Sequence, residues 1–185
     1  MVKILFEDSL IIQDTISIYD TEITCIYDLF QKKVFRGCAH GPGWTWSPEN
    51  PNLFDIKLLL INDDEVADEV NSYFGMRKVH TENGMVYLNN RPYYQRLVLD
   101  QGYWSESLMT APSDEDFKKD IILAKEMGFN GCRKHQKIED PRFLYWADKL
   151  GYLVWSEMPS TTSYSADSVS RITNECIEAL KRDYN

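Results

Sequence analysis

The sequence predicts a chain of two parts, a small antiparallel β-sandwich followed by strands and helices that alternate along a parallel sheet. Before about residue 80, apolar and polar residues alternate as they do in half-buried strands. After about residue 95, short apolar runs are separated by helical patterns, which is typical of β/α units. We therefore expect one domain over residues 1–80 and a second over residues 81–185.

The strands expected in the first part are separated by turn-forming residues. They cover residues 15–19, 21–27, 54–61 and 66–79, the last as one long strand or as two short ones around Gly75. Loop and turn signals lie between them, at Gly41-Pro42-Gly43 and at Asn62-Asp63-Asp64. Several short strands without helices are typical of an antiparallel sandwich.

Two tight turns follow, at Asn83-Gly84 and Asn89-Asn90. Asparagine and glycine tolerate the left-handed backbone conformation that two-residue hairpin loops require. These turns predict a small hairpin that joins the two domains.

Three strand–helix pairs are expected after residue 95, with strands over 96–99, 129–133 and 152–155. Ser113 and Asp140-Pro141 are typical helix beginnings, and Gly128 and Gly151 are typical helix ends. A third helix is expected over 166–181. Successive β/α units build a parallel sheet, and three of them cannot close a barrel. Because a fourth strand is due at Asn185, we expect the parent protein to continue.

Composition argues against several kinds of partner and cofactor. The formal net charge is −9, which disfavours nucleic acid and anionic membrane surfaces.

The chain begins without a signal peptide and has no apolar run of membrane-spanning length, so the default location is cytoplasmic. The cysteines, at 25, 38, 132 and 176, form no C-x-x-C pair, and Cys38-x-His40 has no further ligand nearby. We therefore expect no metal and no cofactor.

Three motifs carry a resemblance to a known family through their order and spacing. The first is Trp46-Ser47-Pro48-Glu49-Asn50-Pro51, and the second is Phe74-Gly75-Met76-Arg77. The third begins at Gly128-Phe129-Asn130-Gly131-Cys132-Arg133, continues through His135 and Asp140-Pro141-Arg142-Phe143, and ends with residues 148–159. On these residues the chain resembles glycoside hydrolase family 2, the group of β-galactosidases, β-glucuronidases and β-mannosidases.

The resemblance implies an immunoglobulin-like β-sandwich followed by the first three β/α units of a TIM (β/α)8 barrel, truncated. It also implies a retaining glycosidase that hydrolyses O-glycosidic bonds of a β-linked carbohydrate. In the family, the two catalytic glutamates follow barrel strands four and seven, and neither strand is expected in these residues. We therefore expect the 185-residue chain to be inactive by itself. Asn174-Glu175 matches the family's asparagine–glutamate pair, but it falls within a predicted helix rather than at a strand end.

Five side chains that follow the predicted barrel strands are candidates for contact with a sugar: Asp100, Trp104, Arg133, His135 and Glu157. Barrel enzymes build their sites at the carboxyl ends of the strands. Arg133 could hold a carboxylate through charge-assisted hydrogen bonds, and His135 could bond a sugar hydroxyl. The structural alternative is a buried Arg133–Glu157 ion pair, or packing of Trp104 within its loop.

The chain departs from the family's usual residues at each of these strand ends. The segment Asp100–Trp104 stands where an asparagine and a histidine usually follow, and His135-Gln136-Lys137 replaces histidine-tyrosine-proline. Ser156-Glu157 replaces aspartate-glutamate. These departures leave the identity of the sugar open.

Two other functions are compatible with parts of the sequence. One is a non-catalytic carbohydrate-binding or interaction module, which would use aromatic loops around Trp44 and Trp46. The other is a doubly wound α/β enzyme that binds phosphate. The second is disfavoured because no glycine-rich loop follows any of the predicted strands.

Overall fold

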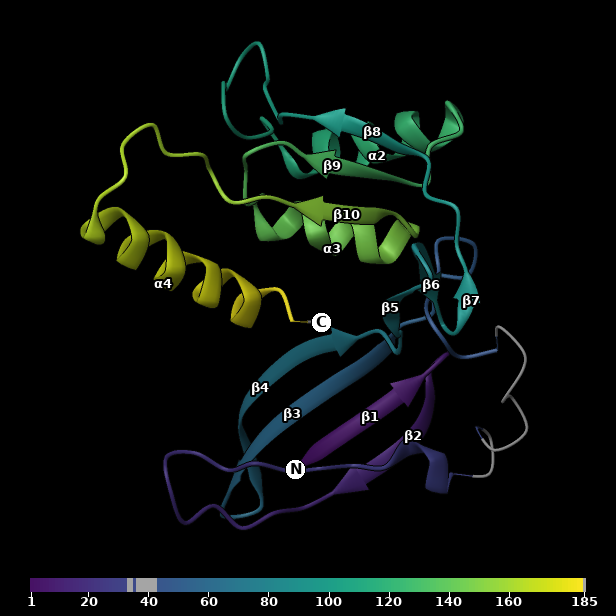
Figure 1. Cartoon of the computed structure of the whole chain (residues 1–185). Coiled ribbons are helices and arrows are strands. Elements are labelled where there is room, and N and C mark those ends of the chain that lie inside the picture. Colours follow the sequence, from purple (N-terminus) through teal and green to yellow (C-terminus); the bar gives the residue numbers. More distant parts are fainter. Residues whose placement is uncertain (33–34, 36–42, 185) are drawn as a thin grey trace. The chain divides into compact units, whose positions relative to one another are not determined.

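The computed structural model describes residues 1–32, 35 and 43–184 and divides into two compact units, Met1–Arg77 and Lys78–Asn185 (Figure 1). Two features of the sequence lie outside the described residues. They are the loop signal at Gly41-Pro42 and the Cys38-x-His40 pair. No helix in the described part of the chain has the length and apolar character needed to cross a bilayer.

The first unit is built on one antiparallel sheet of four strands. These are β1 (Val2–Phe6), β2 (Ser9–Asp14), β3 (Phe54–Asn62) and β4 (Glu65–Phe74), in the order β2-β1-β3-β4. A tight turn at Glu7-Asp8 joins β1 to β2, and one at Asp63-Asp64 joins β3 to β4, with positive φ at all four residues. The prediction of a strand over 54–61 is confirmed, whereas β1 and β2 were not predicted. The described residues of the first unit form no second sheet.

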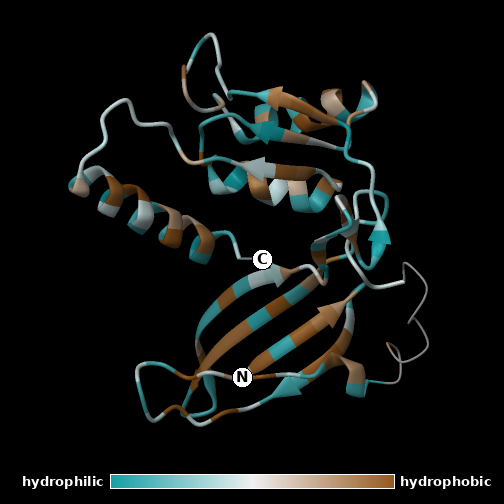
Figure 2. Ribbon diagram, viewed as in Figure 1, coloured by the Kyte–Doolittle hydropathy of each residue, from teal (hydrophilic) through white to brown (hydrophobic). Residues whose placement is uncertain are grey.

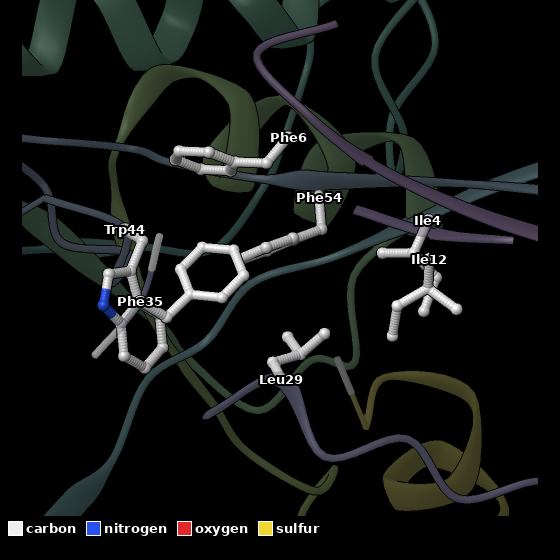
Figure 3. Packing of buried hydrophobic residues seen from close by; sticks show 7 residues of the cluster. All are labelled: Ile4, Phe6, Ile12, Leu29, Phe35, Trp44 and Phe54. Carbon is white, nitrogen blue, oxygen red and sulfur yellow. The ribbon is translucent and has the colours of Figure 1, made fainter. Parts of the chain in front are cut away.

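Aromatic rings dominate the core of the first unit (Figure 3). The ring of Phe54, which is fully buried, lies with its centroid 4.8 Å from that of Phe6, 4.8 Å from that of Phe74 and 5.6 Å from that of Phe35. Trp44 packs edge-on against Phe35, with centroids 5.5 Å apart. This cluster closes one end of the sheet face that β1, β3 and β4 share.

The two strands predicted over 15–19 and 21–27 are not formed, which is a correction to the sequence analysis. The segment has no regular secondary structure, and its apolar residues are largely exposed, with Tyr19 at 93% and Ile26 at 91%. Alternation alone predicted strands here. A strand also needs a neighbour to satisfy its backbone groups, and no described strand pairs with this segment.

A small sheet opens the second unit. Strands β5 (Val79–Glu82), β6 (Met85–Leu88) and β7 (Arg91–Pro92) pair in the order β5-β6-β7. The turns at Asn83-Gly84 and Asn89-Asn90 both have positive φ at their two residues, as predicted for two-residue hairpin loops. The strand predicted over 66–79 ends at Phe74, and the chain enters β5 four residues after Gly75.

The parallel sheet of the second unit confirms the predicted alternation of strands and helices (Figure 1). Its strands are β8 (Leu97–Asp100), β9 (Gly131–Lys134) and β10 (Leu153–Ser156), paired in the order β10-β9-β8. Both pairings are parallel and in register from the first residue to the last. Among the described residues, β8 and β10 each keep one edge without a strand partner.

Helices α2 and α3 begin after the capping residues that the sequence predicts, and the helix predicted over 166–181 is also formed. Helix α2 (Asp114–Glu126) begins after Ser113, whose hydroxyl accepts the backbone N–H of Asp116. Helix α3 (Pro141–Leu150) begins after Asp140 and ends at Gly151, which has φ +71°. Helix α4 (Ala166–Arg182) begins after Ser165, and its side-chain hydroxyl accepts the N–H of Ser168.

The parallel sheet has one covered face and one open face, since residues paired in register share a face and neighbours along a strand alternate. Cys132 lies on the covered face, in a buried core with Phe117 and Ile121 of α2 and Phe143 and Ala147 of α3. On the open face, 56% of Leu99 and 49% of Trp155 are exposed. Helix α4 has an apolar stripe but no buried residue (Figure 2).

Candidate functional site

Charged side chains gather at the carboxyl ends of β8, β9 and β10, and they fall into two groups on opposite faces of the sheet. Strand alternation places Asp100 and Lys134 on the covered face with Cys132, and it places Arg133 on the open face with Leu99 and Trp155. The groups therefore differ in exposure to water and in chemistry.

The covered-face group is centred on Lys134, whose side chain is only 2% exposed. Its Nζ lies 2.5 Å from Oδ2 of Asp100 and 2.9 Å from Oε2 of Glu139, and 3.9 Å from the ring centroid of Phe143. Burial alone would lower the pKa of Lys134, but hydrogen bonds and charges from Asp100 and Glu139 outweigh it and raise the pKa. The lysine is therefore held in its charged form between two carboxylates.

A second lysine extends this group into a chain of four ionic side chains. Nζ of Lys137 lies 3.0 Å from Oε1 of Glu139, which is itself 1% exposed. Burial raises the pKa of Asp120 on α2, and the nearby charges of Asp100 and Glu139 raise it further, against the effect of Lys134. Negative charge is thus crowded around the two ammonium groups.

The open-face group is centred on Arg133 and Glu157. Nε of Arg133 donates to Oε1 of Glu157, and the backbone N–H of Gln136 donates to Oε2 at 3.0 Å. The N–H of Gln136 is the main cause that lowers the pKa of Glu157; desolvation opposes it, and the hydrogen bond and charge of Arg133 lower the pKa further. Both partners stay accessible, with 45% of the Arg133 side chain and 26% of the Glu157 side chain exposed.

His135 lies beside this pair and contacts a residue that the sequence analysis did not single out. Its Nδ1 is 3.2 Å from Nε2 of Gln101, and its backbone N–H donates to the carbonyl of Asp100 at 2.8 Å. A glutamine amide nitrogen can only donate, so this contact favours the tautomer with hydrogen on Nε2. The histidine can then offer an N–H to a ligand hydroxyl.

The five predicted site residues are therefore divided by the fold. Arg133 lies near the carboxyl end of β9, His135 and Glu157 directly follow β9 and β10, and the three side chains lie close together. Asp100 bonds to Lys134 on the covered face and accepts the backbone N–H of Gly102 at 2.7 Å. Trp104 is half-buried and packs against the hydrophobic core of the second unit.

Sequence reasoning missed Gln101, Lys134 and Glu139. Strand alternation carried the signal for the first two, because Gln101 is two residues after Leu99 and Lys134 is two residues after Cys132. Counting in twos from a buried residue would have placed Lys134 inside, where a lysine needs a carboxylate partner. Glu139 had no such signal, because it lies in the loop before α3.

The open-face group can bind a polar, uncharged ligand more readily than a metal. It offers guanidinium and N–H donors and one carboxylate acceptor, which is the complement of a polyhydroxylated sugar. Within the described residues, no cluster of three or more histidine, cysteine, aspartate and glutamate side chains is arranged to hold a metal ion.

The two sequence motifs of the first unit pack against each other. The guanidinium of Arg77 lies over the ring of Trp46, 4.8 Å from its centroid, and the N–H of Trp46 donates to the carbonyl of Met76 at 2.9 Å. A Cβ at Gly75 would approach Cβ of Trp46 and Cδ2 of Leu53 to 3.3 Å. Trp46 is 2% exposed and Trp44 is 7% exposed, so neither offers the open aromatic platform that a binding module would need.

Comparison with known proteins agrees with these motifs. The family model described as Glycosyl hydrolases family 2 matches residues 39–77. A putative β-glucuronidase of Formosa agariphila is 32% identical over 146 residues, which are 76% of this chain and 17% of that protein. The chain belongs to glycosyl hydrolase family 2.

Solved structures of β-glucuronidases have the same fold over these residues. A β-glucuronidase of Bacteroides uniformis is 28% identical with a TM-score of 0.66, over 76% of this chain and 17% of that one. A β-glucuronidase of Parabacteroides merdae has a TM-score of 0.80 over the whole chain and 22% of its own, at 15% identity, which shows the fold alone. The chain spans about a fifth of the length of these relatives.

Proposed function

We propose that the chain is part of a retaining β-glycosidase, with residues 1–80 in an immunoglobulin-like sandwich and residues 81–185 opening a TIM-barrel catalytic domain. The observation that carries the proposal is the open face of the parallel sheet. It combines exposed apolar side chains with an ion pair at the carboxyl ends of the strands. In a closed barrel, this face would be the interior, and the strand ends would line the active site.

The apolar residues of the sheet favour such closure. Leu99 and Trp155 are about half exposed on a face that has no covering element among the described residues, and burial of the exposed half of such a side chain is worth about 1 kcal/mol. A cavity of about 340 Å³ runs along the free edge of β8, between Val98 on the strand and Ile121 and Ala124 on α2. A further parallel strand beside β8 would fill this edge.

We infer that Arg133, His135 and Glu157 contact the sugar and that Gln101 orients His135. Glu157 is held ionised by the N–H of Gln136 and by Arg133, so it would accept hydrogen bonds from hydroxyls rather than donate a proton. Asp100 and Trp104 stay candidates for sugar contact. Their partners, Lys134 and the hydrophobic core, favour a role in holding the first βα loop.

The two carboxyl groups that a retaining mechanism requires lie about 5–5.5 Å apart, one as nucleophile and one as acid and base. We propose that residues 1–185 contain neither. Glu157 is paired with Arg133, and Glu175 lies on the exposed surface of α4, away from any strand end. Without these groups, proton transfer and nucleophilic attack both lack an agent.

The experiment compares the 185-residue chain with the whole product of the natural gene that encodes it. Both are assayed for release of nitrophenol from β-glucuronide, β-galactoside and β-mannoside substrates. We expect release by the whole product and none by the 185 residues. Release by the short chain at enzymatic rates would contradict its inactivity, and no release from any substrate by the whole product would contradict the glycosidase proposal.

The site is tested by substitution in the active product. Arg133→Gln, His135→Asn and Glu157→Gln should each raise KM or lower kcat by about tenfold or more, since each removes a hydrogen bond to a substrate or to a charged group. Lys119→Gln on the exposed surface of α2 is the matched control and should change neither. Unchanged kinetics in all three variants would exclude this face as the sugar site.

A further inference from the structure

The loop between β8 and α2 carries residues toward the candidate site but has few hydrophobic contacts of its own. Tyr103 is 67% exposed, Leu108 is 69% exposed and Met109 is 52% exposed. Trp104 and Leu108 pair through backbone hydrogen bonds of 2.8 and 3.0 Å, which makes the tip of the loop a small closed turn. Trp104 packs against the core of the second unit, but the exposed residues at the tip of the loop receive no such support, so polar contacts have to contribute to holding the turn.

The side chain of Lys137, from the next βα loop, contacts this first loop at two places. Its Nζ donates to the carbonyl of Gly102 at 3.3 Å and to the carbonyl of Met109 at 2.5 Å, and it lies 3.0 Å from Oε1 of Glu139. An ammonium group has three N–H donors, and here three acceptors match them. Only 11% of the side chain is exposed, unlike an ordinary surface lysine.

The acceptor carboxylate is itself fixed from several sides. Oε2 of Glu139 lies 2.9 Å from Nζ of Lys134. Oε1 of Glu139 accepts the backbone N–H of Asp140 at 2.9 Å, at the start of α3. Gly102 fits closely against this assembly, since a Cβ there would lie 2.5 Å from Nζ of Lys137 and 2.7 Å from Oε2 of Glu139. The ammonium of Lys137 is therefore held by Glu139, next to the start of α3, and bonds from there to the loop between β8 and α2.

We propose that Lys137 is a positioning residue that fastens the first βα loop to the scaffold through the carbonyls of Gly102 and Met109. In doing so it fixes the segment that presents Gln101 to His135. The effect on sugar binding rests on the proposed function, but the fastening of the loop does not.

The test is hydrogen exchange on the 185-residue chain with Lys137→Met, which keeps the length of the stem and removes the ammonium. The amides of Trp104 and Leu108 should lose protection by about tenfold or more, because the turn they close is no longer held. The amides of α2 and α3 should keep theirs. Lys119→Met, at an exposed position on α2, is the matched control and should change neither region.

The outcomes separate positioning from general support. Unchanged exchange at Trp104 and Leu108 overturns the proposal. Equal loss of protection in the loop and in both helices overturns it too, because Lys137 would then stabilise the whole unit. If Lys137→Met fails to fold, Lys137→Gln retains a shorter donor and should give the selective loss; failure of both variants to fold means general support. None of these measurements needs a sugar, so their outcomes do not depend on the glycosidase proposal.

Discussion

The two faces of the same three-stranded sheet treat charge in opposite ways. On the covered face, Lys134 is 2% exposed and lies between two carboxylates beneath an aromatic ring. On the open face, one residue earlier in the same strand, 45% of the Arg133 side chain is exposed and its partner is a half-buried glutamate. One strand thus supplies both a structural cation and a candidate binding cation.

The difference follows from what surrounds each charge. A buried ion pair is costly to break because removal of one partner leaves the other charge without water or a counterion. An exposed pair is screened by solvent and contributes little to stability. Its charged atoms are therefore free to bond to a ligand without loss of the fold. We expect loss of a buried ring or of the buried cation on the covered face to destabilise the second unit much more than substitutions on the open face.

The largest expected effect is the loss of a core ring on the covered face. Phe143 is 1% exposed, its ring centroid lies 6.0 Å from that of Phe117, and Phe143→Ala should lower the free energy of unfolding by about 3–5 kcal/mol. Leu99→Ala, on the open face, should cost less than about 1 kcal/mol. Urea denaturation followed by tryptophan fluorescence measures both. Equal costs would mean that something covers the open face in solution.

The second effect is that of an unpaired buried charge. Lys134→Met keeps the stem but leaves Asp100 and Glu139 without their shared cation, which should cost about 3 kcal/mol. Arg133→Met removes the neighbouring cation on the other face and should cost about 1 kcal/mol or less. The pair is measured by the same denaturation. A smaller cost for Lys134→Met than for Arg133→Met would invert the comparison.

The third effect concerns Gly102, which packs closely against Lys137 and Glu139 of the covered-face group. Gly102 has φ +66°, and a Cβ would meet Nζ of Lys137 at 2.5 Å, so Gly102→Ala should cost about 1–3 kcal/mol from backbone strain and displacement together. Gly128 also has positive φ, at +91°, but a Cβ there would meet nothing within 4 Å. Gly128→Ala therefore isolates the backbone contribution, and thermal unfolding should rank Gly102→Ala as the more damaging.

The sequence predicted the order and the ends of the strands and helices better than the contacts between them. Capping residues such as Ser113, Asp140-Pro141 and Gly151 fix the ends of α2 and α3 locally, so the β/α alternation could be predicted from short windows. The assignment of Asp100 to a face needed strand register, which depends on the pairing of β8 with β9 across more than thirty residues of chain. The same limit explains why strands were predicted over 15–27, where alternation exists without a partner strand.

The candidate site shows the same division. Arg133, His135 and Glu157 could be predicted because they follow apolar strands within recognisable motifs. Lys137 could not, because its partners in the other loop are backbone carbonyls that any residue would provide, and Glu139 could not, because it lies in a loop outside any strand or helix pattern. Side-chain contacts with a distant backbone leave no pattern in the sequence.

The smallest expected effect comes from Asp120, whose pKa is raised by burial and by the neighbouring carboxylates on the covered face. Its ordinary pKa is 3.8, and burial, then the charges of Asp100 and Glu139, raise it in the folded chain, although Lys134 opposes them. The unfolded chain therefore releases this proton at lower pH than the folded chain does. Stability from this group is present below pH 3.8 and is lost as the pH rises through the folded-state pKa.

Asp120→Asn removes the charge and keeps the shape, so it should stabilise the second unit at pH 7 by less than about 1 kcal/mol, because water reaches the group and screens it. The gain should vanish when denaturation is repeated near pH 3.5. Asp116→Asn, in the first turn of the same helix, is the control, and it should lower stability at pH 7 because a negative charge there favours the helix dipole. If Asp120→Asn destabilises the chain at pH 7, the carboxylate is a working partner of Lys134 and the covered face holds a larger ion network than its distances indicate.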